Sequence, residues 1–354
     1  MKKVISFVVA LALIFSTAIT FTSCGRASEY IGEVHIYCFG DYFDPELMYK
    51  FEDETGIMVV LDNFDTNEEM YPVIKNGTAE YDLICCSDYM ISQLIDEDLI
   101  QKFDKKALKN YKNLDKKNLA MLEGIDPGNK YAVPHTWGTY GILYNTDHIK
   151  PGEITSWKDL WNPKYKNQII MSDSLRDCMM VPLKMLGYSE NTKSESQLKE
   201  ATDLLIEQKP LVYKYANDAT RDLMIGDAAD IALITSGEVL YVQECNDHMD
   251  YVVPKEGTEV WSDCWAITKA AKNKAYAEKF VDFMLRPENA LANFEYLTYA
   301  IPNEGMYQLM DEDTLSNEVL FPSEETLSRC ETLVTLDEKT RKMYSKYWKK
   351  FKSK

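Results

Sequence analysis

Histidine is scarce in this sequence, and the common catalytic motifs are missing from it. The four histidines are His35, His135, His148 and His248. No two of them have the spacing of metal ligands, and the zinc motif H-E-x-x-H is absent from the sequence. The nucleophile motif G-x-S-x-G, the P-loop and the dinucleotide motif G-x-G-x-x-G are absent from it as well. We therefore expect no metal, no cofactor and a binding protein rather than an enzyme, with a catalytic triad built from distant residues as the open alternative.

Basic residues are too few to balance the acidic ones. The sequence has 39 Lys and Arg residues against 57 Asp and Glu residues, which gives a formal net charge of −18. A surface of this sign repels phosphate, so nucleic acid is not an expected partner. The same charge attracts a cationic ligand. The alternative is that the acidic residues only keep an exported protein soluble.

Long apolar runs are limited to one, at the N-terminus. Lys2 and Lys3 precede an apolar run over residues 4–21, and no second run of this kind, low-complexity segment or internal repeat follows. A basic start, an apolar middle and small residues at the end predict a secretory signal peptide over residues 1–23. An uncleaved membrane anchor is the alternative, because the run is close to the length that spans a bilayer.

Cys24 directly follows this segment. A cysteine at this place resembles the bacterial lipobox, in which the thiol is lipidated before the signal is cleaved, although Phe21 stands where leucine is usual. We predict a lipidated Cys24 and a tether over residues 24–32. The protein is then held by a lipid anchor on the extracytoplasmic face of the cell membrane.

The remaining cysteines show no disulfide pattern. Cys24 is one of eight, which leaves an odd number. Cys85 and Cys86 are adjacent, and Cys38 and Cys178 lie in apolar runs. We expect most of them to be buried thiols that pack as small hydrophobic side chains.

After the signal, about 330 residues remain, which is long enough for two lobes. Strands are predicted at residues 33–39, 58–61, 81–86, 168–171, 211–215 and 230–235. Helices are predicted at residues 45–55, 67–77, 89–95, 175–186, 195–207 and 272–285. This alternation is typical of α/β folds, in which ligands bind at the carboxyl ends of the strands.

Acidic and aromatic residues occur together where several predicted strands end. These groups lie at residues 37–42, 87–89, 172–177 and 261–263, and Tyr299 adds a further aromatic side chain. An ammonium group over an aromatic face gains roughly 0.5–2 kcal/mol, and a carboxylate adds charge-assisted hydrogen bonds. The recurrence of this pattern indicates a shared cleft for an organic cation. Each residue alone has an alternative role, the carboxylates as helix N-caps and the aromatic rings as core.

Longer motifs follow one another along the chain. They are FEDETGI at residues 51–57, YDL at 81–83, AVP at 132–134, WG at 137–138, TSWKDLWNPKYK at 155–166, LGYS at 186–189, VPKEG at 253–257, FMLRP at 283–287 and PN at 302–303. In this order and spacing the chain resembles the substrate-binding proteins of bacterial spermidine/putrescine ABC transporters. Part of the longest motif also occurs in related binders of other solutes.

The resemblance implies an α/β fold of the two-lobed, periplasmic-binding-protein-like clamshell type (type II). Two mixed sheets would carry helices on both faces and be joined by two hinge crossovers, near residues 137–141 and 260–262. The implied first lobe is residues 33–137 with 262–307, and the second is residues 138–261 with 308–354. Such a clamshell closes on its ligand by a hinge motion.

The resemblance also implies a ligand site between the lobes. Carried over by position, the ligand would contact Phe39, Gly40, Asp41, Tyr42, Ser87, Tyr89, Asp177, Trp261, Asp263 and Tyr299. Asp263 would pair with an amine, and Trp261 would stack on the carbon chain of the ligand. The implied function is the capture of polyamines, putrescine and/or spermidine, by a monomer that delivers them to the permease of an ABC importer.

Departures from the family pattern bear on specificity. They are Phe39 and Thr235 in place of Trp, Gly40 in place of a hydroxyl residue, Asp41 and Asp177 in place of Glu, Ser174 in place of a carboxylate, and Leu333 in place of Gln. Fewer carboxylates and less aromatic wall favour putrescine over spermidine. The alternatives are the same fold with another organic cation or small solute, and a secreted enzyme.

Overall fold

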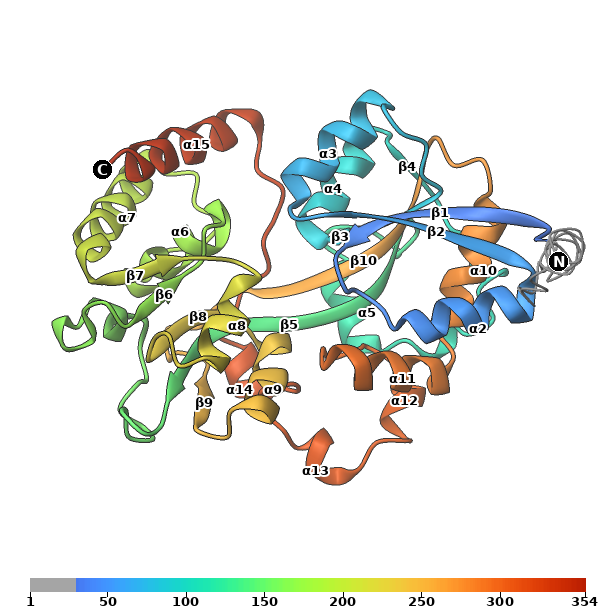
Figure 1. Cartoon of the computed structure of the whole chain (residues 1–354). Coiled ribbons are helices and arrows are strands. Elements are labelled where there is room, and N and C mark those ends of the chain that lie inside the picture. The colour runs from blue at the N-terminus through green and yellow to red at the C-terminus, as the bar shows by residue number, and fades with distance from the viewer. Residues whose placement is uncertain (1–29) are drawn as a thin grey trace, which may run out of the picture.

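The computed structural model describes residues 30–354. Figure 1 shows strands through the middle of the molecule and helices on both sides of them, which confirms the predicted α/β class. The predicted signal peptide, Cys24 and most of the predicted tether lie outside the described residues. In residues 30–354, no helix is both long enough and apolar enough to cross a membrane.

The strands form one hydrogen-bonded path in the order β2-β1-β3-β10-β5-β8-β6-β7, with β4 paired to β10 and β9 paired to β5. Their bounds are β1 (Gly32–Phe39), β2 (Ile57–Phe64), β3 (Leu83–Ser87), β4 (Ile100–Gln101), β5 (Ala132–Asn145), β6 (Ile169–Met171), β7 (Val212–Tyr215), β8 (Ile231–Thr235), β9 (Met249–Val252) and β10 (Val260–Thr268). The first half of β5 pairs with β10, and its second half pairs with β8 and β9. The path therefore has two halves, β1–β4 with β10 and β6–β9, and β5 joins them because it pairs with strands of both.

Helices connect the strands. The longer ones are α2 (Pro45–Thr55), α3 (Asn67–Asn76), α4 (Asp88–Asp96), α5 (Lys116–Leu122), α6 (Leu175–Met185), α7 (Glu195–Gln208), α8 (Ala219–Ile225), α9 (Ser236–Cys245), α10 (Lys274–Met284), α11 (Pro287–Leu297) and α15 (Glu338–Lys352). Short ones are α12 (Glu304–Tyr307), α13 (Glu312–Leu315), α14 (Glu324–Leu327) and the 3₁₀ turns η1 (Tyr111–Asn113), η2 (Trp157–Trp161), η3 (Pro163–Tyr165) and η4 (Lys209–Leu211). Every strand and helix predicted above is present, within a few residues of its predicted bounds.

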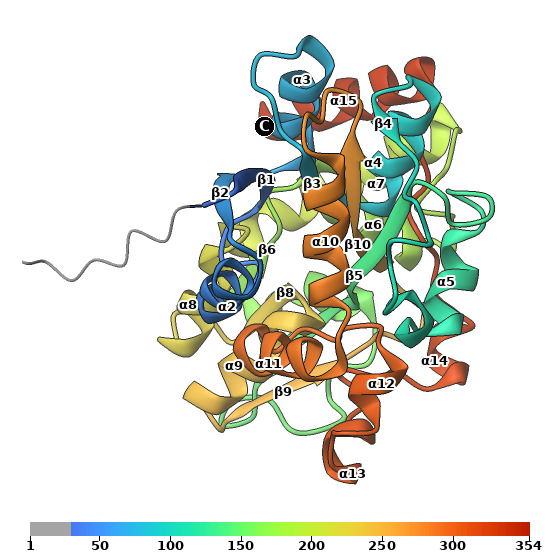
Figure 2. The same cartoon turned by 90° about the vertical axis from the view of Figure 1, so that its right-hand side faces the viewer.

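We call the part built on β1, β2, β3, β4 and β10 the first lobe. Alternating residues of its strands pack on opposite faces. One face packs with α2 and α10, through Phe51 and Phe280 among others. The other face packs with α3 and α4, through Met70 and Ile91. Figure 2 shows α10 and α4 on the two sides of β10.

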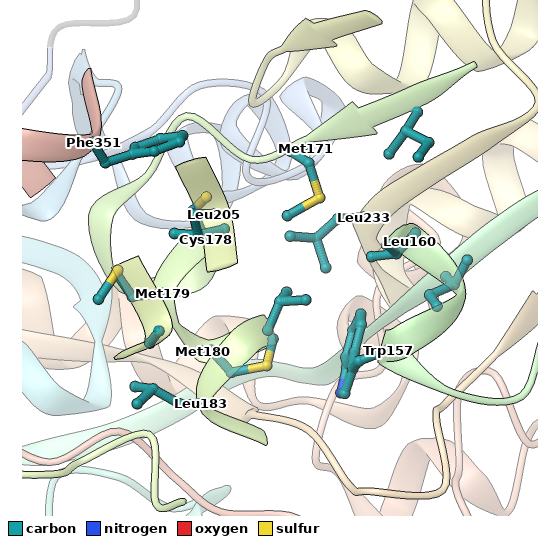
Figure 3. Packing of buried hydrophobic residues seen from close by; sticks show 14 of the residues in the cluster. Trp157, Leu160, Met171, Cys178, Met179, Met180, Leu183, Leu205, Leu233 and Phe351 are labelled. Carbon is teal, nitrogen blue, oxygen red and sulfur yellow. The ribbon is translucent and has the colours of Figure 1, made fainter. Parts of the chain in front are cut away.

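The part built on β6, β7, β8 and β9 is the second lobe. One face packs with α6, α7 and α15, and Figure 3 shows Trp157, Met179 and Phe351 in this core. The other face packs with α8 and α9, through Met224 and Val239. The C-terminal helix α15 therefore packs in the core of the second lobe, although a long segment separates it in sequence from β10, the last strand.

Local sequence explains how these elements begin and end. In α2, the Asp44 side chain accepts from the N–H of Glu46, and Pro45 fits the first turn because its missing N–H would be unpaired there. Gly56 ends this helix with a φ of 67°, a left-handed conformation that costs glycine little. The cysteines of residues 30–354 are all free, and most are buried, as predicted.

Candidate functional site

The centre of the candidate site is Asp263, a carboxylate in the middle of β10 that is only 7% exposed. It lies opposite Ser87, the last residue of β3, whose hydroxyl donates to Asp263 Oδ1 at 2.6 Å. The Tyr42 hydroxyl donates to Asp263 Oδ2 and lies 2.8 Å from Thr136 Oγ1 on β5. Residues from distant parts of the chain thus meet at one buried carboxylate.

Tyr42 reaches Asp263 because the chain turns sharply where β1 ends. Asp41 has a φ of 49°, in the left-handed region that few residues other than glycine adopt. The turn leaves Gly40 and Asp41 exposed, whereas Tyr42 and Phe43 are buried.

Aromatic rings follow one another beside Asp263. The ring centroids of Phe39 and Tyr42 are 5.3 Å apart, those of Tyr42 and Tyr299 6.1 Å, and those of Trp261 and Tyr299 5.8 Å. Trp261 is 7% exposed, and its Nε1 has no hydrogen-bond partner in the described structure. Opposite Trp261 stands Gly138, where a Cβ atom would lie 2.7 Å from Trp261 Cζ2. Glycine at this position therefore leaves space for the indole ring.

Tyr299 links the first lobe to the second. Its hydroxyl donates to Glu238 Oε1 at 2.6 Å, near the start of α9. Arg221 Nη1 lies 3.4 Å from the other oxygen of Glu238. The ring passes so close to Gly237 that a Cβ atom there would lie 2.4 Å from Tyr299 Cδ1. A side chain at residue 237 would therefore push Tyr299 out of this position.

Asp177 and Tyr89 lie at the margins of this cluster. Tyr140, on β5, donates its hydroxyl to Asp177 Oδ2 at 2.8 Å, and Ser172 Oγ lies 3.3 Å from the same oxygen. The Tyr89 hydroxyl lies 3.2 Å from Glu68 Oε1. These contacts hold Asp177 in the second lobe and Tyr89 in the first.

Burial raises the pKa of Asp263 and of Asp177, and the hydroxyl groups that donate to them offset part of this increase. The hydrogen-bond partners of Asp263 in residues 30–354 are hydroxyl groups, not cations. A cation placed beside these carboxylates would favour their charged forms and lower both pKa values. The arrangement is therefore suited to an organic ammonium group with an apolar chain. Residues 30–354 contain no cluster of three or more His, Cys, Asp and Glu side chains arranged to hold a metal ion.

The structure brings together six of the predicted ligand residues. They are Phe39, Tyr42, Ser87, Trp261, Asp263 and Tyr299. Gly40 and Asp41 are exposed beyond the end of β1, and Tyr89 and Asp177 form contacts of their own. As ligand contacts, all ten residues remain predictions.

The sequence analysis missed Glu238 and Tyr140, which hold Tyr299 and Asp177 in place. The predicted strand over residues 230–235 ends at Thr235, and Glu238 follows it closely. An acidic residue after a strand end was the pattern used to choose the other site residues, so it could have identified Glu238 as well. Tyr140 lies in β5, and no strand was predicted there.

Comparison with known proteins gives the family. Residues 46–322 match the family model described as bacterial extracellular solute-binding protein. The spermidine/putrescine-binding periplasmic protein of Salmonella typhimurium is 33% identical over 321 residues, which cover 90% of this chain and 91% of that protein. The putrescine-binding periplasmic protein PotF of Escherichia coli is 30% identical and covers 99% of this chain and 98% of its own length.

Solved structures agree with the sequence comparison. The spermidine/putrescine ABC transporter substrate-binding protein PotD of Streptococcus pneumoniae superposes with a TM-score of 0.80 at 38% identity, covering 91% of this chain and 99% of that one. This likeness confirms the predicted type II clamshell fold, and the relatives are binding proteins of transport systems, not enzymes. The chain therefore belongs to the bacterial extracellular solute-binding proteins, in the family of the spermidine/putrescine-binding proteins of ABC transporters.

Proposed function

We propose that this protein captures polyamines, putrescine and/or spermidine, between its two lobes and delivers them to the permease of an ABC importer. The names of its relatives support this function. The ligand would contact the ten residues carried over from the family, with Asp263 as the main partner of an ammonium group. The lobes would be residues 33–137 with 262–307 and residues 138–261 with 308–354.

The observation that carries the proposal is the environment of Asp263. A buried carboxylate without a cationic partner is costly in its charged form. Asp263 keeps two hydroxyl donors and lies beside Trp261 and Tyr299. An ammonium group would neutralise the charge of Asp263. The rings would bury methylene groups of the ligand, which stabilises the complex by about 0.8 kcal/mol per CH₂. A neutral solute could offer this carboxylate only a further neutral hydrogen bond, and an anionic solute would be repelled by it.

A thermal-shift screen of the purified protein tests the proposal. The ligands are putrescine, spermidine, cadaverine and agmatine, with thiamine and neutral amino acids as other solutes. Butane-1,4-diol is a matched control because it keeps the carbon chain of putrescine and lacks the ammonium groups. A ligand at 100 times its dissociation constant adds about 2.7 kcal/mol to the free energy of unfolding, which raises the melting temperature measurably.

We expect a shift with one or more polyamines and none with the diol. A shift with thiamine alone would support the alternative of the same fold with another organic cation. If no polyamine raises the melting temperature, the proposed function is refuted.

We also propose that the protein is a monomeric lipoprotein, anchored by Cys24 on the extracytoplasmic face of the membrane. The basic and apolar start of the sequence and the place of the cysteine support this proposal. The wild type should incorporate labelled fatty acid and lose residues 1–23, whereas Cys24→Ala should incorporate none and keep the uncleaved signal. A wild type that incorporates no fatty acid and retains residues 1–23 would instead indicate an uncleaved N-terminal anchor.

A further inference from the structure

Glu259 immediately precedes β10 and is a carboxylate with 4% exposure. The Tyr140 N–H donates to the Glu259 carbonyl oxygen at 3.2 Å, so Glu259 stands opposite Tyr140, just as Val260 stands opposite Thr139. Side chains of an extended chain alternate between its two sides. Glu259 therefore points to the same side as Trp261 two residues later and as Asp263 four residues later.

No hydrogen bond satisfies this carboxylate fully. Glu259 Oε2 is buried and has no partner in the described structure. Asp177, Glu190 and Asp88 act on it electrostatically and, with burial, raise the pKa of Glu259 well above its usual value, while Arg176 opposes them. The side chain thus lies among other acidic groups.

The nearby cations form no direct contact with Glu259. Arg176 Nη2 donates to Asn191 Oδ1 at 2.8 Å, and Arg176 Nε is buried without a partner in the described structure. Lys184, which is 4% exposed, pairs with Glu331 at 2.9 Å. Neither forms a hydrogen bond or ion pair with Glu259 in residues 30–354. Arg176 favours the charged form of Glu259 without contacting it. A cation in direct contact with this carboxylate would have to come from the ligand, because a buried charge without such a partner costs several kcal/mol.

The position of Glu259 extends the proposed ligand site. Four residues of strand span roughly 13 Å, so Glu259 and Asp263 mark two ends of one row of side chains, with Trp261 between them. Asp177 lies beside this row because Tyr140, the residue opposite Glu259, donates to it. The row therefore offers carboxylates at both ends of an aromatic surface, as a long, multiply charged cation requires.

We propose that Glu259 is a specificity-determining residue that binds one ammonium group of a triamine. The inference rests on the proposed function, which it deepens by naming the number of charges in the ligand. A triamine such as spermidine has one ammonium group for each of Asp263, Asp177 and Glu259, whereas a diamine leaves one carboxylate unpaired. The proposal reverses the sequence-based preference for putrescine, because that preference did not count Glu259.

Isothermal titration of the purified protein with spermidine and with putrescine tests the proposal. The wild type is compared with Glu259→Gln, which keeps the shape of the side chain and removes its charge. Glu259→Asp keeps the charge on a shorter side chain. The matched control is Glu278→Gln, because Glu278 is also buried but accepts from the Asp104 N–H, away from this row.

We expect the wild type to bind spermidine more tightly than putrescine. Glu259→Gln should weaken spermidine binding at least tenfold and putrescine binding less than threefold, so that the preference is lost. Glu259→Asp should retain part of the preference, and Glu278→Gln should retain all of it. A purely structural role for Glu259 would weaken both ligands alike.

The outcomes separate the two proposals. If the wild type binds no polyamine, both the proposed function and this inference fail. If it binds polyamines and Glu259→Gln keeps the wild-type preference, only the inference fails. A wild type that prefers putrescine also refutes it. If Glu259→Gln does not fold, the result with Glu259→Asp decides: equal losses for both ligands contradict the proposal, and a loss confined to spermidine supports it.

Discussion

Replacement of Asp263 by asparagine is the sharpest test of the site. The change keeps the size of the side chain and one carbonyl-type acceptor, but it removes the charge that an ammonium group would meet. A hydrogen bond to a charged group contributes about 1.5–3 kcal/mol, and an ion left buried without its partner costs about 3–5 kcal/mol. We expect a loss of about 2.7 kcal/mol in binding free energy, which is about a hundredfold in affinity.

The stability of the ligand-free protein should respond differently. Because burial already disfavours the charged form of Asp263, neutral asparagine in its place removes no favourable ion pair. Asparagine can accept from one of the two hydroxyl groups, those of Tyr42 and Ser87, and donate to the other. We expect the free energy of unfolding to change by less than about 1 kcal/mol.

Asp82 provides a matched control. It is a buried aspartate of the first lobe, and its oxygens accept from the N–H groups of His35 and Asn273. Asp82→Asn turns one acceptor into a donor that faces an N–H, so it should lower stability by about 1–3 kcal/mol and leave ligand affinity unchanged.

Isothermal titration with spermidine and urea unfolding measure the two quantities for each variant. The reasoning is wrong if Asp263→Asn binds polyamines within threefold of the wild type, or if Asp82→Asn loses affinity as strongly.

Three further predictions follow from the geometry and the pKa shifts. Polyamine affinity should fall as the pH is lowered from about 7.5 to about 5.5. The pKa values of Asp263 and Asp177 are raised, so these groups take up protons that an ammonium group must displace when it binds. The affinity then falls by up to tenfold per pH unit for each proton released. Titration calorimetry over this range measures the effect, and an affinity independent of pH would contradict it. Burial raises the pKa of Glu190 to about 8 from its usual 4.5. Between these two pH values the folded state keeps the proton and the unfolded state loses it, so the free energy of unfolding falls as the pH rises from 4.5 to about 8. Glu190→Gln should therefore raise the free energy of unfolding by about 1–3 kcal/mol near pH 8 and much less near pH 5, as measured with urea; an equal effect at both pH values would refute the assignment. Tyr299→Phe removes the hydrogen bond to Glu238 between the lobes and should weaken polyamine binding about three- to tenfold at a similar melting temperature. An unchanged affinity of this variant would mean that the Tyr299 hydroxyl takes no part in holding the site.

Several features of the fold could be read from local sequence. The helix α2 has Asp44 and Pro45 at its start and Gly56 at its end, so its bounds follow from the chemistry of helix termini. The short buried strands are apolar runs bounded by polar residues, as parallel strands usually are.

The two strands that build the site were not predicted. Every residue of β10 is buried, so no alternation of apolar and polar residues marks it as a strand. β5 contains Pro134 and Gly138, which argue against a central strand when the sequence is read alone. A shift of register between Asp263 and Cys264, opposite Pro134, accommodates the proline in the sheet.

The sequence by itself determined the family, the α/β class, the helix termini and the acidic and aromatic residues at the ends of β1, β3 and β6. Trp261 and Asp263, which were also predicted at a strand end, instead lie within β10. Apart from the family, each of these correct predictions depends on residues close together in the chain. Only the tertiary structure decided which groups meet: Ser87 and Tyr42 at Asp263, and Glu238 at Tyr299. These partners are far apart in sequence, and their distances depend on the register between β3, β5 and β10, which no local pattern encodes.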